Sequence, residues 1–157
     1  MTKETLAYIA GFLDGDGCIM LQLVYLHDYV LGYQIRASVV FYQKNQYEWF
    51  LSWLKEQFDG VGYIRDRKDG MSEYTIVGGK QVKKVLVQLL PYFRLKNKQA
   101  EIALKVISQM PGSGRKMTED KLLLLAKDVD QFLELNYSKR RTNTSAKLKE
   151  FLKSKHS

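Results

Sequence analysis

The sequence predicts an α+β domain in which helices pack on one face of a curved antiparallel sheet and leave the other face free. Two pairs of segments rich in β-branched and aromatic residues, each pair joined by turn-forming residues, predict two hairpins. Segments with apolar residues at helical spacing precede, separate and follow these hairpins. With 157 residues and 45% hydrophobic content, the chain can form one domain with a substantial core.

The first predicted helix begins near Lys3 and ends in the acidic, glycine-rich stretch 14–17. Along it, Ala7, Gly11 and Gly15 recur every four residues and form a ridge with almost no side chain. Because glycine inside a helix costs about 1 kcal/mol relative to alanine, we expect this ridge to allow the close approach of a second helix. The apolar run is too short to span a bilayer, so we expect no membrane partner.

Asp14 and Asp16 lie at the predicted C-terminal end of this helix, where the macrodipole disfavours carboxylates and favours a cation. If two copies of the helix pack through the ridge, two Asp16 side chains come together and offer the oxygen ligands that Mg²⁺ prefers. A simple Asp-Gly turn is the alternative. An EF-hand loop is excluded, because Cys18 and Tyr25 occupy its fifth and twelfth positions.

Residues 18 to 26 and 33 to 43 predict the first hairpin. Side chains alternate between the two faces of a strand, so the even-numbered face of the second strand carries the polar groups. The residues on this face are Gln34, Arg36, Ser38, Val40 and Tyr42. In the first strand, Gln22 is the strong hydrogen-bonding residue on the matching face, among apolar neighbours.

A helix from Asn45, as its N-cap, to about Phe58 separates the hairpins. Its expected inner stripe consists of Trp49, Phe50, Trp53, Leu54 and Phe58. The second hairpin is predicted from strands 61–67 and 72–78, joined by a Lys-Asp-Gly turn. Its outward side chains are Tyr63, Arg65 and Arg67 on one strand and Glu73 and Thr75 on the other.

Three more helices are predicted at 80–90, 97–109 and 118–135. The net charge is +8, and from residue 136 on seven Lys or Arg residues stand against one Glu. We therefore expect a core domain over residues 1–135 and a basic, partly helical tail over residues 136–157. A chain this basic is attracted to phosphates, although a basic end is often only solvated.

Few features of the sequence indicate the cellular compartment. The chain has one cysteine, Cys18, which cannot form an internal disulfide, and no signal peptide precedes the first helix. We therefore expect an intracellular, reducing environment.

Residues 10–17, with the sequence AGFLDGDG, resemble the signature of the LAGLIDADG homing endonucleases, which cut long DNA sites as dimers or pseudo-dimers. The resemblance continues in the same order through Gln43-Lys44, the segment 60–67 and the segment 95–100. It extends over roughly the first 135 residues, and several spaced motifs are more specific than one. These features are similar to the compact single-motif members encoded in organelle introns, so a chloroplast or mitochondrial origin is implied by the resemblance alone.

The resemblance implies a site at the end of the first helix and a LAGLIDADG-like fold whose free sheet face forms a DNA-binding saddle. Asp16 aligns with the metal-ligating aspartate, the carbonyl of Gly15 with a second ligand, and Gln43 and Lys96 with catalytic pocket residues. Single-motif members tend to carry a basic residue four places after this glutamine, where the chain has Tyr47. Lys44 or Lys98 can compensate for it.

The resemblance also assigns DNA contacts. The aligned sheet positions are Gln22, Gln34, Arg36, Ser38, Arg65, Arg67, Glu73 and Thr75, and the tail adds Lys139, Arg140 and Arg141. Arginine forks suit guanine edges or phosphate. Surface ion pairs of the hairpin arginines with Asp66 or Glu73 are the alternative.

The implied function is a homodimeric, Mg²⁺-dependent, site-specific endonuclease that makes a double-strand break in a long pseudo-palindromic DNA site. We expect Mn²⁺ to substitute, Ca²⁺ to bind without cleavage, and no small-molecule cofactor. An RNA-splicing maturase or a non-cleaving DNA-binding protein of the same fold is the alternative. A basic protein that coats nucleic acid without specificity would not need a glycine ridge ending in acid.

Overall fold

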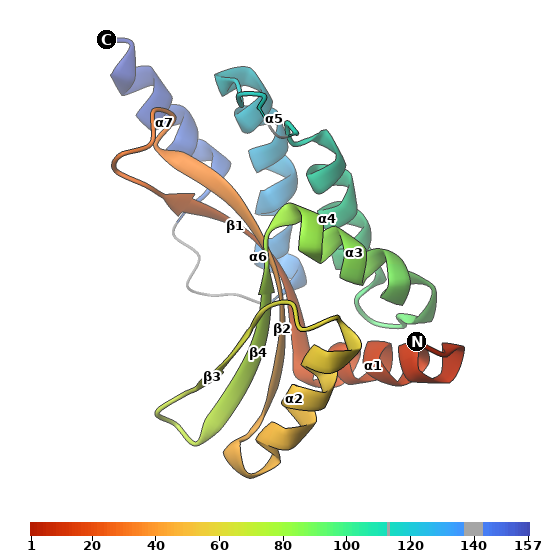
Figure 1. The fold of residues 1–157 in the computed structure, drawn as a ribbon. Coiled ribbons are helices and arrows are strands. Elements are labelled where there is room, and N and C mark those ends of the chain that lie inside the picture. The colour runs from red at the N-terminus through yellow and green to blue at the C-terminus, as the bar shows by residue number, and fades with distance from the viewer. Residues whose placement is uncertain (113, 137–142) are drawn as a thin grey trace.

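A four-stranded antiparallel sheet with the strand order β1-β2-β4-β3 forms the centre of the computed structural model, which describes residues 1–112, 114–136 and 143–157. Figure 1 shows helices α1 to α5 on one side of the curved sheet, as the sequence predicts. The strands are β1 (Gly17–Tyr25), β2 (Tyr33–Lys44), β3 (Tyr63–Asp66) and β4 (Met71–Val77). The helices are α1 (Lys3–Asp16), α2 (Glu48–Gln57), α3 (Gly79–Leu89), α4 (Asn97–Gln109), α5 (Glu119–Asp130), α6 (Phe132–Leu135) and α7 (Ser145–Lys155), with short 3₁₀ turns η1 (Asn45–Tyr47) and η2 (Leu90–Tyr92).

Both predicted hairpins are confirmed. β1 pairs with β2 from Gly17 opposite Phe41 to Tyr25 opposite Tyr33, and β4 pairs with both β2 and β3. The odd-numbered side chains of β2 from Tyr33 to Phe41 are buried against the helices, together with Tyr74 of β4. The register therefore turns the even-numbered face of β2 away from the helical layer.

The helical layer is built on α1. Ile9, Ala10 and Leu13 are buried in the core, as the predicted spacing requires, and Thr2 caps the helix by accepting a hydrogen bond from the Thr5 amide at 3.1 Å. The ridge residues of α1 remain exposed on its outer side. α1 thus has one face buried in the core and an opposite face exposed at the surface.

Two expectations for α2 are wrong. Asn45 does not cap the helix, because the turn η1 comes first and α2 begins at Glu48; the Asn45 side chain lies 2.6 Å from the Ser72 hydroxyl instead. Trp49 is not on the inner stripe but is 68% exposed. Leu51 joins the expected Leu54 and Phe58 in the buried stripe, and Phe50 and Trp53 pack against the core as expected.

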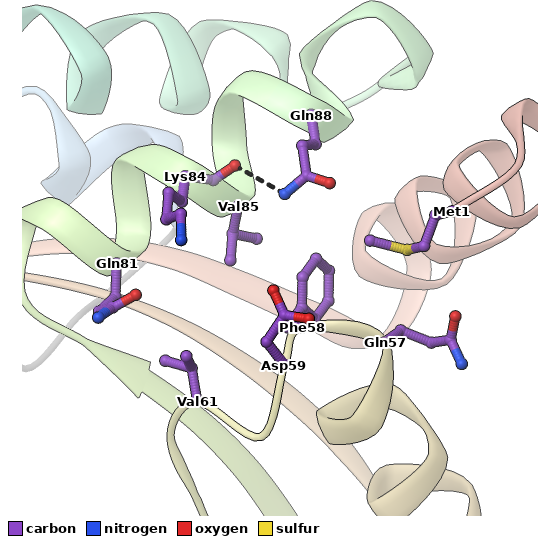
Figure 2. Close-up of a pocket in the computed structure, with 9 residues that line it drawn as sticks. All are labelled: Met1, Gln57, Phe58, Asp59, Val61, Gln81, Lys84, Val85 and Gln88. Atoms are coloured by element: carbon purple, nitrogen blue, oxygen red, sulfur yellow. Dashed lines mark hydrogen bonds between the residues drawn. The ribbon is translucent and has the colours of Figure 1, made fainter.

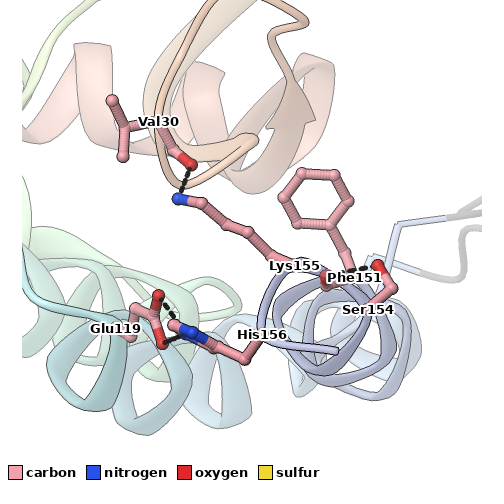
Figure 3. Close-up of polar contacts among 6 residues, drawn as sticks. All are labelled: Val30, Glu119, Phe151, Ser154, Lys155 and His156. Carbon is pink, nitrogen blue, oxygen red and sulfur yellow. Dashed lines mark hydrogen bonds and ion pairs between the residues drawn. The ribbon is translucent and has the colours of Figure 1, made fainter.

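The C-terminal region packs more closely than a basic tail suggests. The helix predicted over 118–135 is interrupted at Gln131, which divides it into α5 and α6. In α7, Leu148 and Leu152 are buried in the common core. Figure 3 shows how the end of α7 is held, with Lys155 donating to the Val30 carbonyl and His156 lying 2.9 Å from Glu119.

Asn136 and Asn143 form hydrogen bonds with the open edge of the sheet. β1 is an edge strand, and its carbonyls at Ile19 and Leu23 accept hydrogen bonds of 2.9 Å from the Asn136 and Asn143 side chains. Such contacts satisfy polar groups that an edge strand would otherwise expose. No helix within the described ranges has the length and apolar character needed to cross a membrane.

Candidate active site

The end of α1 passes directly into β1 and leaves Asp16 exposed at the junction. Gly17 allows this connection, because a Cβ atom there would lie only 2.3 Å from Leu13 Cδ1 and 2.9 Å from the Val40 carbonyl oxygen. A surface cavity at this point is lined by Gly15, Asp16, Gly17, Tyr42, Gln43, Lys44 and Met71. The fold therefore brings the predicted residues Asp16 and Gln43 together, and adds Lys44.

Asp14 has surroundings that differ from our expectation. We expected both carboxylates at the helix end to favour a cation, but Asp14 is buried and its oxygens accept backbone hydrogen bonds. The donors are the amides of Arg94 at 2.7 Å, Leu95 at 3.3 Å and Lys96 at 3.1 Å. Asp16 is thus the carboxylate that remains open at this end of α1.

Lys96 reaches the same helix end from the other side. Its Nζ donates to the Asp14 carbonyl oxygen at 2.5 Å. It lines a second cavity together with Gly17, Cys18, Lys98 and Asn136. Gly17 borders both cavities, so Lys96 lies next to the Asp16 cavity without lining it.

The donor set at the end of α1 fits a hard divalent cation. Asp16 and the Gly15 carbonyl supply oxygen atoms, and the negative end of the helix dipole favours positive charge. Among the described residues, no three His, Cys, Asp or Glu side chains gather into a metal-binding group. One chain therefore offers one exposed carboxylate here, and a second copy is needed to bring another.

Tyr47 and Glu48 are not among the residues that line the cavity. A hydrogen bond to Asp66 raises the pKa of Glu48, and the same bond lowers the pKa of Asp66, which also accepts from the Ser72 hydroxyl at 2.8 Å. Glu48 thus turns toward β3. Because Tyr47 is neutral at this place, Lys44 supplies a positive charge among the residues that line the cavity.

The free face of the sheet carries only part of the predicted DNA-contact set. Gln22, Gln34 and Arg36 are exposed there. Ser38 and Thr75 are only 5% and 6% exposed, and their base contacts remain predictions. Ser38 is covered because its strand neighbours are Met20 and Val77, which are larger apolar side chains.

The arginines of the second hairpin form local ion pairs. Arg65 lies 2.5 Å from Glu73, as the alternative interpretation expects, and Arg67 lies 2.8 Å from Asp69. The Arg67–Asp69 pair is exposed on both sides, and exposed ion pairs contribute only about 0 to 1 kcal/mol, so a phosphate or a guanine edge can replace Asp69. Arg67 also lies 6.0 Å from the ring centre of Tyr42, whose pKa is raised by burial and by the nearby Cys18 and Glu73.

Three predicted contact residues, Lys139, Arg140 and Arg141, lie outside the described residues. A further cavity lies between α2, α3 and the start of the chain, as Figure 2 shows. It is lined by Met1, Gln57, Phe58, Asp59, Val61, Gln81, Lys84, Val85 and Gln88. The lining residues include none of those predicted for the active site.

Comparison with known proteins decides the family. The profile of the LAGLIDADG endonuclease family matches residues 9–107, which is more than half of the chain. The chain is 41% identical over 152 residues to DNA endonuclease I-CreI of Chlamydomonas reinhardtii, covering 97% of this chain and 91% of the relative. This chain belongs to the LAGLIDADG endonuclease family.

Other members of the LAGLIDADG family support the assignment. DNA endonuclease I-CvuI of Chlorella vulgaris is 37% identical over 147 residues, covering 94% of this chain and 89% of the relative. The crystal structure of I-CvuI with its target in the presence of Ca superposes with a TM-score of 0.90, at 36% identity and with 96% of this chain and 94% of that chain covered. The predicted α+β, LAGLIDADG-like fold is therefore confirmed.

Exposed apolar side chains lie on α1 and on segments next to it, and the sequence analysis did not predict them. Apart from the chain neighbours and the backbone of α1 itself, no atom of the described residues lies within 4 Å of a Cβ built on Gly11 or Gly15. Tyr8, Trp49 and Leu95 are exposed beside α1, with exposed fractions of 58%, 68% and 73%. Tyr8 packs edge-on against Phe50 at 6.1 Å. Apolar side chains that the predicted core does not need are the signal in the sequence that could have indicated a contact surface larger than the glycine ridge.

Proposed function

We propose that this chain is a homodimeric, divalent-metal-dependent homing endonuclease that makes a double-strand break in a long pseudo-palindromic DNA site. One observation carries the proposal: exposed Asp16 shares a cavity with Gln43 and Lys44, and Lys96 is held at the same helix end. Membership of the LAGLIDADG endonuclease family and relatives named as DNA endonucleases support it.

Each site residue has a proposed chemical role. Asp16 and the Gly15 carbonyl hold a divalent cation, which when bound acts as a Lewis acid and makes water nucleophilic at neutral pH. The Gln43 Oε1 accepts from the Lys44 amide at 2.9 Å, which leaves the Gln43 Nε2 to orient water. Lys96 and Lys44 stabilise the negative charge that develops around the scissile phosphate.

A second copy of the chain completes the enzyme. One Asp16 cannot serve two strands symmetrically, whereas two-fold pairing of α1 through Ala7, Gly11 and Gly15 brings two of them together. The exposed Tyr8 and Trp49 would be buried at the edge of this contact. The target is then expected to be pseudo-palindromic.

The sheet face opposite the helices binds the target. Exposed Gln22, Gln34 and Arg36 offer hydrogen bonds to base edges, and Arg65 and Arg67 suit guanine or phosphate. Glu73 orients Arg65 through their ion pair. Lys139, Arg140 and Arg141 add phosphate contacts, so affinity should fall as salt rises.

Mg²⁺ is the expected metal, with Mn²⁺ as a substitute and Ca²⁺ as a ligand that supports binding without cleavage. The relative I-CvuI has been crystallised with its DNA target in the presence of 2 mM Ca, and with the I-CreI target in the presence of 2 mM Mg with the DNA not cleaved. These relatives come from Chlamydomonas reinhardtii and Chlorella vulgaris, and coding in an organelle intron is part of the proposal.

A specific observation favours the alternative that the chain does not cleave DNA, as a DNA-binding protein or an RNA-splicing maturase of the same fold. Tyr47 stands where single-motif members tend to have a basic residue, and Glu48 turns away to Asp66. If Lys44 does not replace the missing charge, binding would persist without cleavage.

Cleavage of a randomised-site DNA library separates these functions. We expect cut products with two-fold related ends in Mg²⁺ and none in Ca²⁺. Sequencing the products would give the target. Retention of selected DNA without any cut in Mg²⁺ or Mn²⁺ would favour the non-cleaving alternative, and binding without sequence preference would contradict both.

A further inference from the structure

A buried polar contact to which the proposed function assigns no role joins the end of α1 to the start of α4. Asp14 Oδ2 accepts from the amides of Arg94 and Leu95, and Asp14 Oδ1 accepts from the amide of Lys96. These donors are about eighty residues away along the chain, and the carboxylate is 8% exposed. A buried carboxylate with three backbone donors is held in one position, because leaving any of these groups unpaired would be costly.

The same residue also holds the Lys96 side chain. The Asp14 carbonyl oxygen accepts from Lys96 Nζ at 2.5 Å, so the main chain and the side chain of Lys96 are both fixed on one residue. Asp14 is two positions before Asp16 on the same helix. It therefore connects the proposed metal ligand to the proposed cationic group.

α4 depends on this contact at its start. Its N-cap residue, Lys96, makes no side-chain capping bond, and its first turn contains no acidic residue. The Asp14 carboxylate supplies the negative charge that a helix N-terminus favours. Loss of this carboxylate would therefore loosen the segment that carries Lys96, and leave the outward position of Asp16 unchanged.

We propose that Asp14 is a positioning residue for the cleavage reaction, which holds Lys96 in place beside the Asp16 end of α1. This inference rests on the proposed endonuclease function. Asp14→Asn keeps the size of the side chain but places an amide N–H₂ against backbone N–H donors. Since misplacement of a catalytic group by about 1 Å can cost a hundredfold in rate, we expect single-turnover cleavage in Mg²⁺ to slow by roughly 10- to 100-fold.

A double-mutant cycle tests whether Asp14 acts through Lys96. We expect Asp14→Asn to slow cleavage strongly in the wild-type background, by less than about threefold in a Lys96→Met background, and to leave DNA affinity in Ca²⁺ unchanged. Val106→Ala, a buried change in α4 away from Lys96, is the control for lost stability and should keep the wild-type rate at a temperature where it stays folded. Equal slowing by Asp14→Asn in both backgrounds would overturn the proposal.

Hydrogen exchange gives a readout that does not depend on cleavage. In Asp14→Asn we expect the amides of residues 94–96 to exchange at least about tenfold faster, with exchange in α5 unchanged. Unchanged exchange at these amides would contradict the positioning role, whether or not the enzyme cuts DNA. Failure of the wild-type chain to cut any library site would instead count against the proposed function, and would leave this exchange result to decide the role of Asp14.

Discussion

Two aspartates on one helix acquire opposite roles from their surroundings. Asp14 is buried and accepts three backbone hydrogen bonds, whereas Asp16 is exposed beside Gln43. Both are close to the negative end of α1, where a carboxylate is unfavourable unless it finds donors or a cation. Asp14 accepts hydrogen bonds from donors inside the chain, so Asp16 is the carboxylate that remains open for the proposed metal.

Replacing Asp16 by asparagine should separate binding from chemistry. Asp16→Asn removes the charge that holds the cation and relieves an unfavourable carboxylate, worth about 0.3 to 1 kcal/mol, at the helix end. We expect cleavage to fall to background, with specific affinity kept or improved, in a single-turnover assay beside a gel-shift titration. Cutting at the wild-type rate, or joint loss of binding and cutting, would show that Asp16 is not the metal ligand.

Glu48 should make stability depend on pH. Its pKa is raised above 4.5 by the hydrogen bond to Asp66, so the folded chain holds this proton more tightly than the unfolded chain. The stabilising contribution is complete below pH 4.5 and is lost as the pH rises through the raised pKa. Asp66, whose pKa is lowered below 3.8, contributes in the opposite sense, and its share is lost as the pH falls.

Glu48→Gln should remove this dependence, because glutamine keeps a hydrogen-bond donor for Asp66 at every pH. We expect its urea midpoint to match that of the wild type near pH 4.5, to exceed it as the pH rises through the raised pKa of Glu48, and to keep a constant advantage at higher pH. Gln57→Glu, a change at the other end of α2, is the control. The urea midpoint of this variant should still depend on pH in the way that the wild-type midpoint does. If the urea midpoints of Glu48→Gln and wild type differed by the same amount at all pH values, a proton held between Glu48 and Asp66 would be contradicted.

At the scale of the elements, α1 combines a core face with an interface face. Gly11 is better suited than Gly15 to test the interface, since the Gly15 carbonyl is a proposed metal ligand. A Cβ at Gly11 has no atom of another described segment within 4 Å. Leucine is also a better helix former than glycine, by roughly 0.8 kcal/mol.

Gly11→Leu should therefore leave the folded monomer intact and weaken the dimer. Overpacking at a close helix contact costs about 1 to 3 kcal/mol or more, so we expect dimer affinity to fall at least about tenfold in sedimentation. Lys127→Leu, which adds the same side chain to an exposed position of α5, should not change the dimer. Unchanged dimer affinity for Gly11→Leu would show that the ridge is not the interface.

Over the whole molecule, α7 connects the C-terminal region to the sheet. Phe151 fills the space above Gly32, where a Cβ would lie 2.3 Å from its ring, and packs against Tyr33 at 5.6 Å. Gly32 has φ 75°, a conformation that suits glycine. The tip of the first hairpin is therefore supported by the last helix of the chain.

Leu148→Ala tests whether the region over 136–157 is energetically part of the core domain. A large-to-small change at a fully buried leucine typically costs about 2 to 5 kcal/mol. We expect this loss in the urea unfolding of the whole chain as one transition, while Lys149→Ala on the exposed side of α7 should change little. A transition of the core that Leu148→Ala leaves unchanged would favour a separate tail.

Local patterns were sufficient for most of the secondary structure, except for the start of α2 and the break at Gln131. Alternation predicted the strands of both hairpins, and helical spacing with capping residues such as Thr118 predicted α1, α3, α4 and the start of α5. The failures involve contacts between distant segments. Asn45 bonds to Ser72 across the sheet instead of capping α2, and Ser38 is covered by neighbours on two other strands.

The sequence by itself determined the fold class, the family and the meeting of Asp16 with Gln43, because strand alternation, helical spacing and the motif order are local properties of the chain. The tertiary structure alone decided which aspartate faces outward, where Lys96 is anchored and which polar residues of the sheet stay exposed. The physical reason is that burial and hydrogen-bond partners arise from segments far apart in sequence. For Asp14, the partners come from Arg94 to Lys96, and no pattern around Asp14 foretells them.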